Sequence, residues 1–450
     1  MQHLKITFLI YSILALLLAS CSGKQTLRGV FKNQTPYERY VAKLKDAKLD
    51  QTALGQDWLT AGKQALQDSI IVALPFKETG YFSAEKPKAL GYRIDAKRGE
   101  RITVNLEMKA REAALVFLDI FEAPAIPGAE PDHVASADTL TTTLTYEVEE
   151  DLPHILRVQP ELLRGGQYTV TIKSEPTLAF PVAGKSSRNI ASVWGDSRDG
   201  GARRHEGIDV FAPRGTPALA SAEGLVTRVS TTPRGGKVVW VSDFNRRQNL
   251  YYAHLDSQLV SPGQRVQPGD TIGFIGNTGN AKTTKPHLHF GIYRSGRGAT
   301  NPYPYVHASS VTAPPVKIDA THIGNWIRIA ARSANVRLQP NINSDVYTTL
   351  PQHTPLLVTG GTTDWYRIRL PHGKEAYVAS SLVEATHKPI NSGKLSEAAP
   401  VLDQPYTGAP AMDHLKAGSS IAVMGKYKEF SLIKNETGMI GWLPGSVKLF

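Results

Sequence analysis

Four of the thirteen histidines in the chain fall between residues 205 and 289, together with a nearby aspartate. The segment opens with His205-Glu-Gly-Ile-Asp209, closes with His287-Leu-His289, and has His254 between these ends. A catalytic zinc ion takes three protein ligands from imidazole nitrogens and carboxylate oxygens, and leaves its fourth position for water. Two of the histidines and Asp209 would supply such a set, and two histidines would remain. The cluster therefore predicts a mononuclear metal site.

The residue types also indicate a hydrolytic reaction. Zinc held by two neutral imidazoles and one carboxylate lowers the pKa of bound water from about 15.7 to about 7, so that the water can attack a carbonyl carbon. The two remaining histidines suit proton transfer, because an unperturbed imidazole pKa of about 6.5 lies near working pH. Glu206 is a competing general base, but the adjacent Gly207 and an aspartate as second ligand argue against a helical H-E-x-x-H motif.

Strands and tight turns are expected to position these side chains. Leu288 and Phe290 alternate with the histidines of the last motif. On a strand, both imidazoles would therefore project from one face while the apolar pair enters the core. The glycine-rich segment Gly269–Gly279 holds no titratable group suited to catalysis. We expect it to form a tight hairpin near the cleft.

The motifs of this region occur together in one known family. "RRHEGIDVFAPRGTP", "YAHL", "PGDTIGFIGNTG" and "HLHF" resemble the lysostaphin-like (LytM-type) zinc endopeptidases of peptidoglycan, over residues 190–305. The resemblance implies a central antiparallel-β peptidase domain with a Zn2+ cofactor. It makes His205, Asp209 and His289 the zinc ligands and His254 and His287 the catalytic pair, without dividing the acid and base roles between the two. The implied activity is hydrolysis of peptide cross-links in cell-wall remodelling, with D,D-endopeptidase activity preferred.

Two other functions stay open. Inactive relatives of the family bind peptidoglycan or activate a cell-wall amidase, and they typically lose several of the five residues that are all present here. The alternative of a non-catalytic envelope protein is therefore disfavoured. A biotinyl- or lipoyl-like carrier is a weaker alternative, because Lys282 and Lys285 lie in the loop before His287 rather than at a hairpin tip.

The N-terminal residues resemble a lipoprotein signal. Residues 1–20 hold an apolar run from Phe8 to Leu18, which is short for a membrane span and right for the core of a secretory signal. The following "LASC" resembles the bacterial lipobox, which implies lipidation of Cys21, the only cysteine. Ser22 after it indicates an outer-membrane anchor facing the periplasm if the envelope is Gram-negative. One cysteine predicts no disulfide framework.

The remaining regions predict a mainly β, multidomain protein. Residues 21–69 should form a tether and a helical hairpin, because Thr35-Pro-Tyr-Glu38 is a capping box with proline at the first helical position. Over residues 70–175 apolar and polar residues alternate, as at 102–106, and turn residues precede the strands. This pattern predicts an antiparallel β-sandwich, which most simply acts as a spacer.

The C-terminal region contains an internal repeat with a constant offset of 65 residues, so that Gln339-Pro340 match Gln404-Pro405. Short strands, turn glycines and aromatics at this period predict two small β-barrels, at residues 320–386 and 395–450. The first, "ANVRLQP" to "DWYRIRLPHGKEAYVASSLV", resembles bacterial SH3-like domains, which commonly bind cell-wall peptides. Barrels that only pack against their neighbours are the alternative.

Composition limits the partners. Hydrophobic content of 41% with 29 prolines and 38 glycines is typical of a soluble, loop-rich β protein. The net charge of +11 suggests an acidic partner. No basic run is interleaved with aromatics, so we expect no nucleic acid. Peptidoglycan and a membrane anchored through Cys21 are the expected partners, and the sequence leaves the oligomeric state open.

Overall fold

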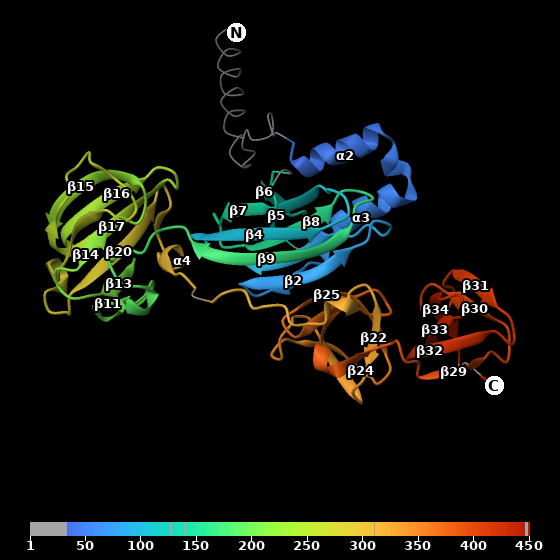
Figure 1. The fold of residues 1–450 in the computed structure, drawn as a ribbon. Coiled ribbons are helices and arrows are strands. Elements are labelled where there is room, and N and C mark those ends of the chain that lie inside the picture. The colour runs from blue at the N-terminus through green and yellow to red at the C-terminus, as the bar shows by residue number, and fades with distance from the viewer. Residues whose placement is uncertain (1–33, 127, 139–140, 310, 446–448) are drawn as a thin grey trace, which may run out of the picture.

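The computed structural model describes residues 34–450 except residues 127, 139–140, 310 and 446–448 (Figure 1). The predicted signal segment and Cys21 lie outside the described residues. Most described elements are strands, which confirms the prediction of a mainly β protein. Within the described part of the chain, no helix is long and apolar enough to cross a membrane.

A helical hairpin begins the described chain. It consists of α2 (Pro36–Asp46) and α3 (Ala53–Gln67). The predicted capping box is confirmed: the Glu38 amide donates to the Thr35 hydroxyl at 3.1 Å, and the Thr35 amide donates to the Glu38 carboxylate at 2.8 Å. Trp58 on α3 is 1% exposed, and its indole N–H donates to the Pro160 carbonyl at 2.8 Å. The hairpin is thus fixed to the domain that follows.

That domain is a sandwich of two sheets around one core. The first sheet contains, in spatial order, β1 (Ile70–Val72), β3 (Leu90–Asp95), β8 (Pro153–Pro160), β5 (Val116–Glu122) and β6 (Asp132–Ser136). The second contains β2 (Phe76–Phe82), β9 (Gly166–Pro176), β4 (Glu100–Lys109) and β7 (Thr143–Glu147). The predicted alternation holds, because Ile102, Val104 and Leu106 are all 2% exposed or less. One pairing, β1 with β3, is parallel rather than antiparallel.

A ten-stranded sheet forms the next domain. Its main path is β10 (Ile190–Ser192), β13 (Ile208–Phe211), β20 (His287–Arg294), β17 (Gln248–Gln258), β16 (Gly236–Asp243), β15 (Gly224–Thr232) and β18 (Arg265–Val266). Beside it lie β14 (Pro217–Leu219), β19 (Thr271–Ile275) and β21 (Gly298–Thr300), with the small ribbon β11 (Ser197–Arg198) and β12 (Arg203–Arg204) and the short helix α4 (Tyr303–Val306). The core includes Leu178 and Val182, so it extends before the predicted boundary at residue 190.

The glycine-rich segment corrects one prediction. It does not form a tight hairpin, because residues 271–275 form β19, which pairs with β14 and β17. Gly269 and Gly279, with φ of +97° and +74°, lie just outside the two ends of this strand region. Glycine tolerates these left-handed conformations. The loop after β19 leads directly to the histidines described below.

The C-terminal region consists of two β units, the first with seven strands and the second with six. The first contains β22 (Trp326–Ile329), β23 (Ser333–Arg337), β24 (Val346–Pro351), β25 (Pro355–Thr362), β26 (Trp365–Arg369), β27 (Glu375–Ala379) and β28 (Val383–Ala385). The second contains β29 (Asn391–Lys394), β30 (Ala399–Leu402), β31 (Ala411–Leu415), β32 (Ser420–Tyr427), β33 (Phe430–Asn435) and β34 (Ile440–Pro444). β25 and β32 begin and end 65 residues apart, and each carries a bulge at its fourth to sixth residue. The sequence repeat is therefore also a structural repeat.

The first C-terminal unit is continuous with the sandwich. β2 pairs with β25 through Thr79↔Gly361 and Gly80↔Gly360, which gives one eleven-stranded sheet. Beneath this junction the Glu78 carboxylate, 0% exposed, accepts hydrogen bonds from three tyrosines and an arginine. The donors are Tyr92 at 2.8 Å, Tyr168 at 3.1 Å, Tyr377 at 3.1 Å and Arg367 at 3.0 Å. Residues 70–175 and 320–386 were predicted to be separate units, but the pairing of β2 with β25 joins their strands in one sheet.

The ten-stranded domain lies at one end of the sandwich and the helical hairpin near the other (Figure 1). Arg246 donates to both carboxylate oxygens of Glu147 at 2.9 Å across the interface. Gly99 lies so close to Tyr305 that a Cβ there would be 2.3 Å from the ring.

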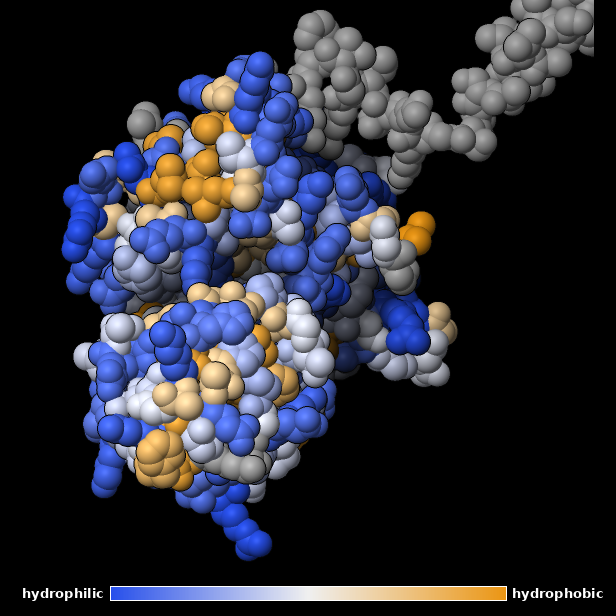
Figure 2. Space-filling model, turned by 90° about the vertical axis from the view of Figure 1, so that its right-hand side faces the viewer, coloured by the Kyte–Doolittle hydropathy of each residue, from blue (hydrophilic) through white to orange (hydrophobic). Residues whose placement is uncertain are grey.

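On the face shown in Figure 2, most side chains are hydrophilic and the hydrophobic ones form several separate patches. Apolar contact surface is thus dispersed on this face.

Candidate metal centre

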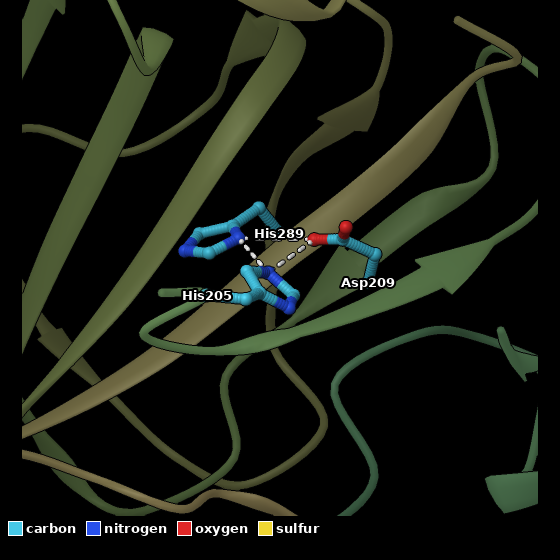
Figure 3. A group of neighbouring side chains, drawn as sticks. All are labelled: His205, Asp209 and His289. Carbon is cyan, nitrogen blue, oxygen red and sulfur yellow. Dashed lines mark hydrogen bonds and ion pairs between the residues drawn. The ribbon is translucent and has the colours of Figure 1, made fainter. Parts of the chain in front are cut away.

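Three predicted ligands meet where β13 and β20 pair. Asp209 on β13 lies opposite His289 on β20 in the antiparallel register, and His205 lies just before β13 (Figure 3). The three ligand atoms are His205 Nε2, Asp209 Oδ1 and His289 Nδ1, and each pair of them is 3.0 Å apart. Among the described residues, this group contains no fourth His, Cys, Asp or Glu. The structure therefore brings together the predicted ligand set.

Neighbouring groups fix how each ligand atom is presented. His205 Nδ1 donates to the Val193 carbonyl at 2.8 Å, so Nε2 of the neutral ring carries a lone pair. Burial lowers the pKa of His289, which also favours the neutral ring. Burial alone would raise the pKa of Asp209, but hydrogen bonds and charges from His205 and His289 outweigh it and hold the pKa well below its usual range. Once a cation takes the place of the protons between them, all three atoms can act as electron-pair donors.

This donor set fits a zinc ion. Three electron-pair donors that face one another at 3.0 Å need a cation or protons between them. A tetrahedral zinc ion with bonds of 2.0–2.1 Å would hold its ligand atoms about 3.3 Å apart, which is close to the observed spacing. A backbone carbonyl on the non-ligand nitrogen of a histidine, as Val193 provides, is also typical of metal sites.

The other two histidines lie beside this group. The ring centroids of His254 and His287 are 5.1 Å apart, and that of His254 is 5.9 Å from that of His289. His254 Nδ1 donates to the Thr278 carbonyl at 2.9 Å, and His287 Nδ1 donates to the Lys285 carbonyl at 2.8 Å. Each neutral ring therefore has its lone pair on Nε2. His254 and His287 therefore form a pair of side chains that can accept or donate protons. The pair lies next to the metal group, which is the set of His205, Asp209 and His289.

The backbone at His254 is unusual. Its φ is +61°, in a region where non-glycine residues are uncommon and histidine is enriched. Its amide donates to the Gly235 carbonyl at 2.8 Å, and its carbonyl accepts from the Gly276 amide at 3.1 Å. His287 is held differently, by stacking on Phe211 with ring centroids 4.9 Å apart. Two loops and one aromatic ring thus set the orientation of the pair.

Several groups that orient these histidines escaped the sequence analysis. The carbonyls of Val193, Thr278 and Lys285 leave no signal in the sequence, because every residue has a carbonyl. Arg198 was also missed, although its guanidinium donates to Asp209 Oδ2 at 2.7 Å. The charged segment before His205 was the only signal available for it.

Gly207 sets the position of His289. A Cβ at residue 207 would lie 2.6 Å from Cε1 and 2.8 Å from Nε2 of that ring, and 2.7 Å from the Phe290 carbonyl. We expect Gly207→Ala to displace the imidazole and weaken zinc binding about tenfold, as disturbed ligand orientation commonly does. Titration against a competing chelator measures this. Gly296→Ala is the control for a strained glycine replacement away from the site, because its φ is +71° but an added Cβ there meets nothing within 4 Å. Equal zinc affinity in both variants would contradict the prediction.

His254 should stay neutral in weakly acidic solution. Burial, together with the nearby rings of His289 and His287, lowers the pKa of His254 to about 4. Because the unfolded value is about 6.5, the neutral ring adds stability to the metal-free protein above pH 6.5, and this stability is lost as the pH falls towards 4. An imidazole NMR titration, with His254→Gln to assign the signal, should show the low pKa. Titration near pH 6.5 would refute it.

Comparison with known proteins agrees with this geometry. A family model described as Peptidase family M23 matches residues 203–302, and one described as Bacterial SH3 domain matches residues 332–384. The L-Ala--D-Glu endopeptidase of Bacillus subtilis is 36% identical over 142 residues, which are 29% of this chain and 43% of that protein. The peptidoglycan DD-endopeptidase ShyC of Vibrio cholerae is 37% identical over 131 residues, 27% of either protein.

A solved structure is also similar. The catalytic domain of the antimicrobial peptidase lysostaphin from Staphylococcus simulans is 29% identical, covers 26% of this chain and 92% of that chain, and has a TM-score of 0.24. This chain spans less than half the length of the two curated relatives described above. The match to the SH3 model ends at residue 384, before the second C-terminal unit, so the SH3-like character of that unit stays a prediction. Residues 203–302, which contain all five predicted site residues, are a peptidase family M23 domain, and residues 332–384 are a bacterial SH3 domain.

Proposed function

We propose that this protein is a zinc-dependent endopeptidase that hydrolyses peptide cross-links of peptidoglycan during cell-wall remodelling, as a D,D-endopeptidase. One observation carries the proposal: His205, Asp209 and His289 converge at 3.0 Å beside the His254–His287 pair, within a peptidase family M23 domain. The name of the Vibrio cholerae relative, a peptidoglycan DD-endopeptidase, supports the choice of bond. Peptidoglycan is also the proposed partner of the SH3 domain.

Each of the five site residues has a role in the proposed reaction. His205, Asp209 and His289 would hold the zinc ion, which when bound supplies Lewis acidity that activates water and polarises the scissile carbonyl. His254 and His287 each present an Nε2 lone pair, since carbonyls hold their Nδ1 protons. Either ring can take the proton from the attacking water and pass it to the leaving amine. Both residues are largely buried, at 8% and 5% exposure, so their rings are held in fixed positions beside the three ligand residues.

Product analysis tests this function. Zinc-loaded full-length protein is incubated with purified cross-linked muropeptide dimers, and the products are identified by mass spectrometry. We expect two monomers that together exceed the dimer by the mass of one water, with the cut at the D,D cross-link. His289→Ala, matched in fold and concentration, should leave the dimer intact. An intact dimer with the zinc-loaded wild type would refute the endopeptidase function.

We further propose that Cys21 carries the lipid anchor and that the protein faces the periplasm from the outer membrane. The support is the sequence "LASC" followed by serine. Cell fractionation of the wild type and of Cys21→Ser tests this. The wild type should be recovered with outer membranes and the variant should not, whereas identical recovery of both in the soluble fraction would contradict the anchor.

A further inference from the structure

Arg198 binds the carboxylate oxygen of Asp209 that faces away from the metal group. Its Nη2 donates to Asp209 Oδ2 at 2.7 Å and to the Ser192 hydroxyl at 2.5 Å. The other oxygen, Oδ1, is the one that lies 3.0 Å from both His205 and His289. Each oxygen of this carboxylate thus has a separate set of partners, one toward the metal group and one toward the arginine.

The same short segment also holds His205. The Ser192 hydroxyl donates to Asp196 Oδ2 at 2.8 Å and lies 3.2 Å from His205 Nδ1. Asp196 also accepts from the Val193 amide at 2.9 Å, and the Val193 carbonyl accepts from His205 Nδ1 at 2.8 Å. Residues 192–198 therefore form one hydrogen-bonded network that reaches two of the three ligands.

The surroundings separate this contact from an ordinary surface ion pair. The Asp209 side chain is only 10% exposed and that of Arg198 is 29% exposed. Charge-assisted hydrogen bonds in such settings are stronger than neutral ones, whereas exposed ion pairs contribute about 0–1 kcal/mol. A carboxylate without this partner could rotate, or could offer both oxygens to a cation.

We infer that Arg198 is a positioning residue, which holds Asp209 so that Oδ1 alone is offered to the metal and so helps to preform the site. Arg198 touches neither the ligand atoms of the histidines nor the reacting atoms, and acts through Asp209 and Ser192. This inference rests on the zinc site of the proposed function and extends it to a residue outside the ligand set.

Zinc affinity of the full chain, measured by competition with a chelator, tests the inference. Arg198→Ala should raise the zinc Kd about 10- to 100-fold, the range usual for partners of metal ligands. Arg198→Lys should recover only part of the affinity, because a flexible ammonium group does not hold its donors in the fixed plane from which the two N–H groups of Nη2 reach Asp209 and Ser192. Arg203→Ala is a matched control: Arg203 is also 29% exposed but pairs with Asp199 at 3.0 Å, and its Kd should stay within about twofold of the wild type.

The possible results separate cleanly. Wild-type affinity in Arg198→Ala, or an equal loss in Arg203→Ala, overturns the inference. Circular dichroism of the metal-free variants checks folding, and if Arg198→Ala does not fold, Ser192→Ala should still show a several-fold weaker affinity; an unchanged Kd there also overturns it. Because zinc affinity is read without substrate, a wild type that binds zinc but cleaves nothing would refute the proposed function and leave this inference standing.

Discussion

Replacing His254 with alanine is expected to lower kcat/KM for cleavage of cross-linked muropeptides by about 10²- to 10⁴-fold, the usual contribution of a general acid or base. The ring lies beside the metal group rather than in it, since its centroid is 5.9 Å from that of His289. One zinc ion per chain should therefore stay bound. Steady-state kinetics and metal analysis on the same preparation measure both quantities.

Two other variants bracket this result. His287→Ala should show a loss of similar size with zinc retained, because its Nε2 is presented in the same way as that of His254. His307→Ala, an exposed histidine stacked on Tyr303, should cleave at the wild-type rate. Full activity in His254→Ala would exclude this ring from proton transfer, and loss of zinc would assign it to the metal group instead.

Glu78→Gln is expected to lower the free energy of unfolding by about 3 kcal/mol, because it removes one partner from a buried charged network. The carboxylate is 0% exposed and accepts from Tyr92, Tyr168, Tyr377 and Arg367. These donors come from both the sandwich and the SH3 domain, so the loss falls on the junction between them. Denaturant unfolding of the zinc-free chain measures the change in the transition that includes this unit.

A graded series controls this prediction. Tyr377→Phe removes one donor and should cost about 1.5–3 kcal/mol, the value of a hydrogen bond to a charged group. Glu112→Gln removes one acidic partner of Arg164, from an ion pair whose side chains are 67% and 41% exposed, and should cost about 0–1 kcal/mol. If Glu78→Gln is as stable as Glu112→Gln, the buried network does not hold the two domains together.

Local patterns of the sequence predicted much of the fold. The capping box at Thr35 and the alternation at residues 102–106 are each set by neighbours in the chain, and both are present. The offset of 65 residues also predicted the strand positions of the second C-terminal unit, because a repeated sequence without gaps repeats its strands. The M23 and SH3 resemblances are confirmed by family models.

Features that depend on distant contacts could not be predicted. The pairing of β2 with β25 joins residues 79–80 to residues 360–361, and neither strand carries a local signal of its partner. The glycine-rich segment was wrongly expected to be a hairpin. Gly269, Gly276 and Gly279 flank β19 and Gly273 lies within it, so no turn joins two strands of that segment.

The candidate site shows the same division. The five predicted residues lie close together in the structure. They could be predicted because their side-chain types form motifs that are visible in the sequence. The carbonyls that fix the histidine rings leave no trace there, so which nitrogen faces the site could be read only from the structure. The roles of the five residues stay predictions until the variants above are measured.

The rate of cleavage of a purified cross-linked muropeptide dimer, measured before and after zinc removal, tests the proposed chemistry most directly. The chelated, metal-free protein should leave the dimer intact, and one equivalent of zinc per chain should restore the full rate. The same zinc should restore nothing in His289→Ala. Cleavage by the metal-free wild type at the rate of the reloaded protein would contradict the assignment of His205, Asp209 and His289 as the ligands of a catalytic zinc ion.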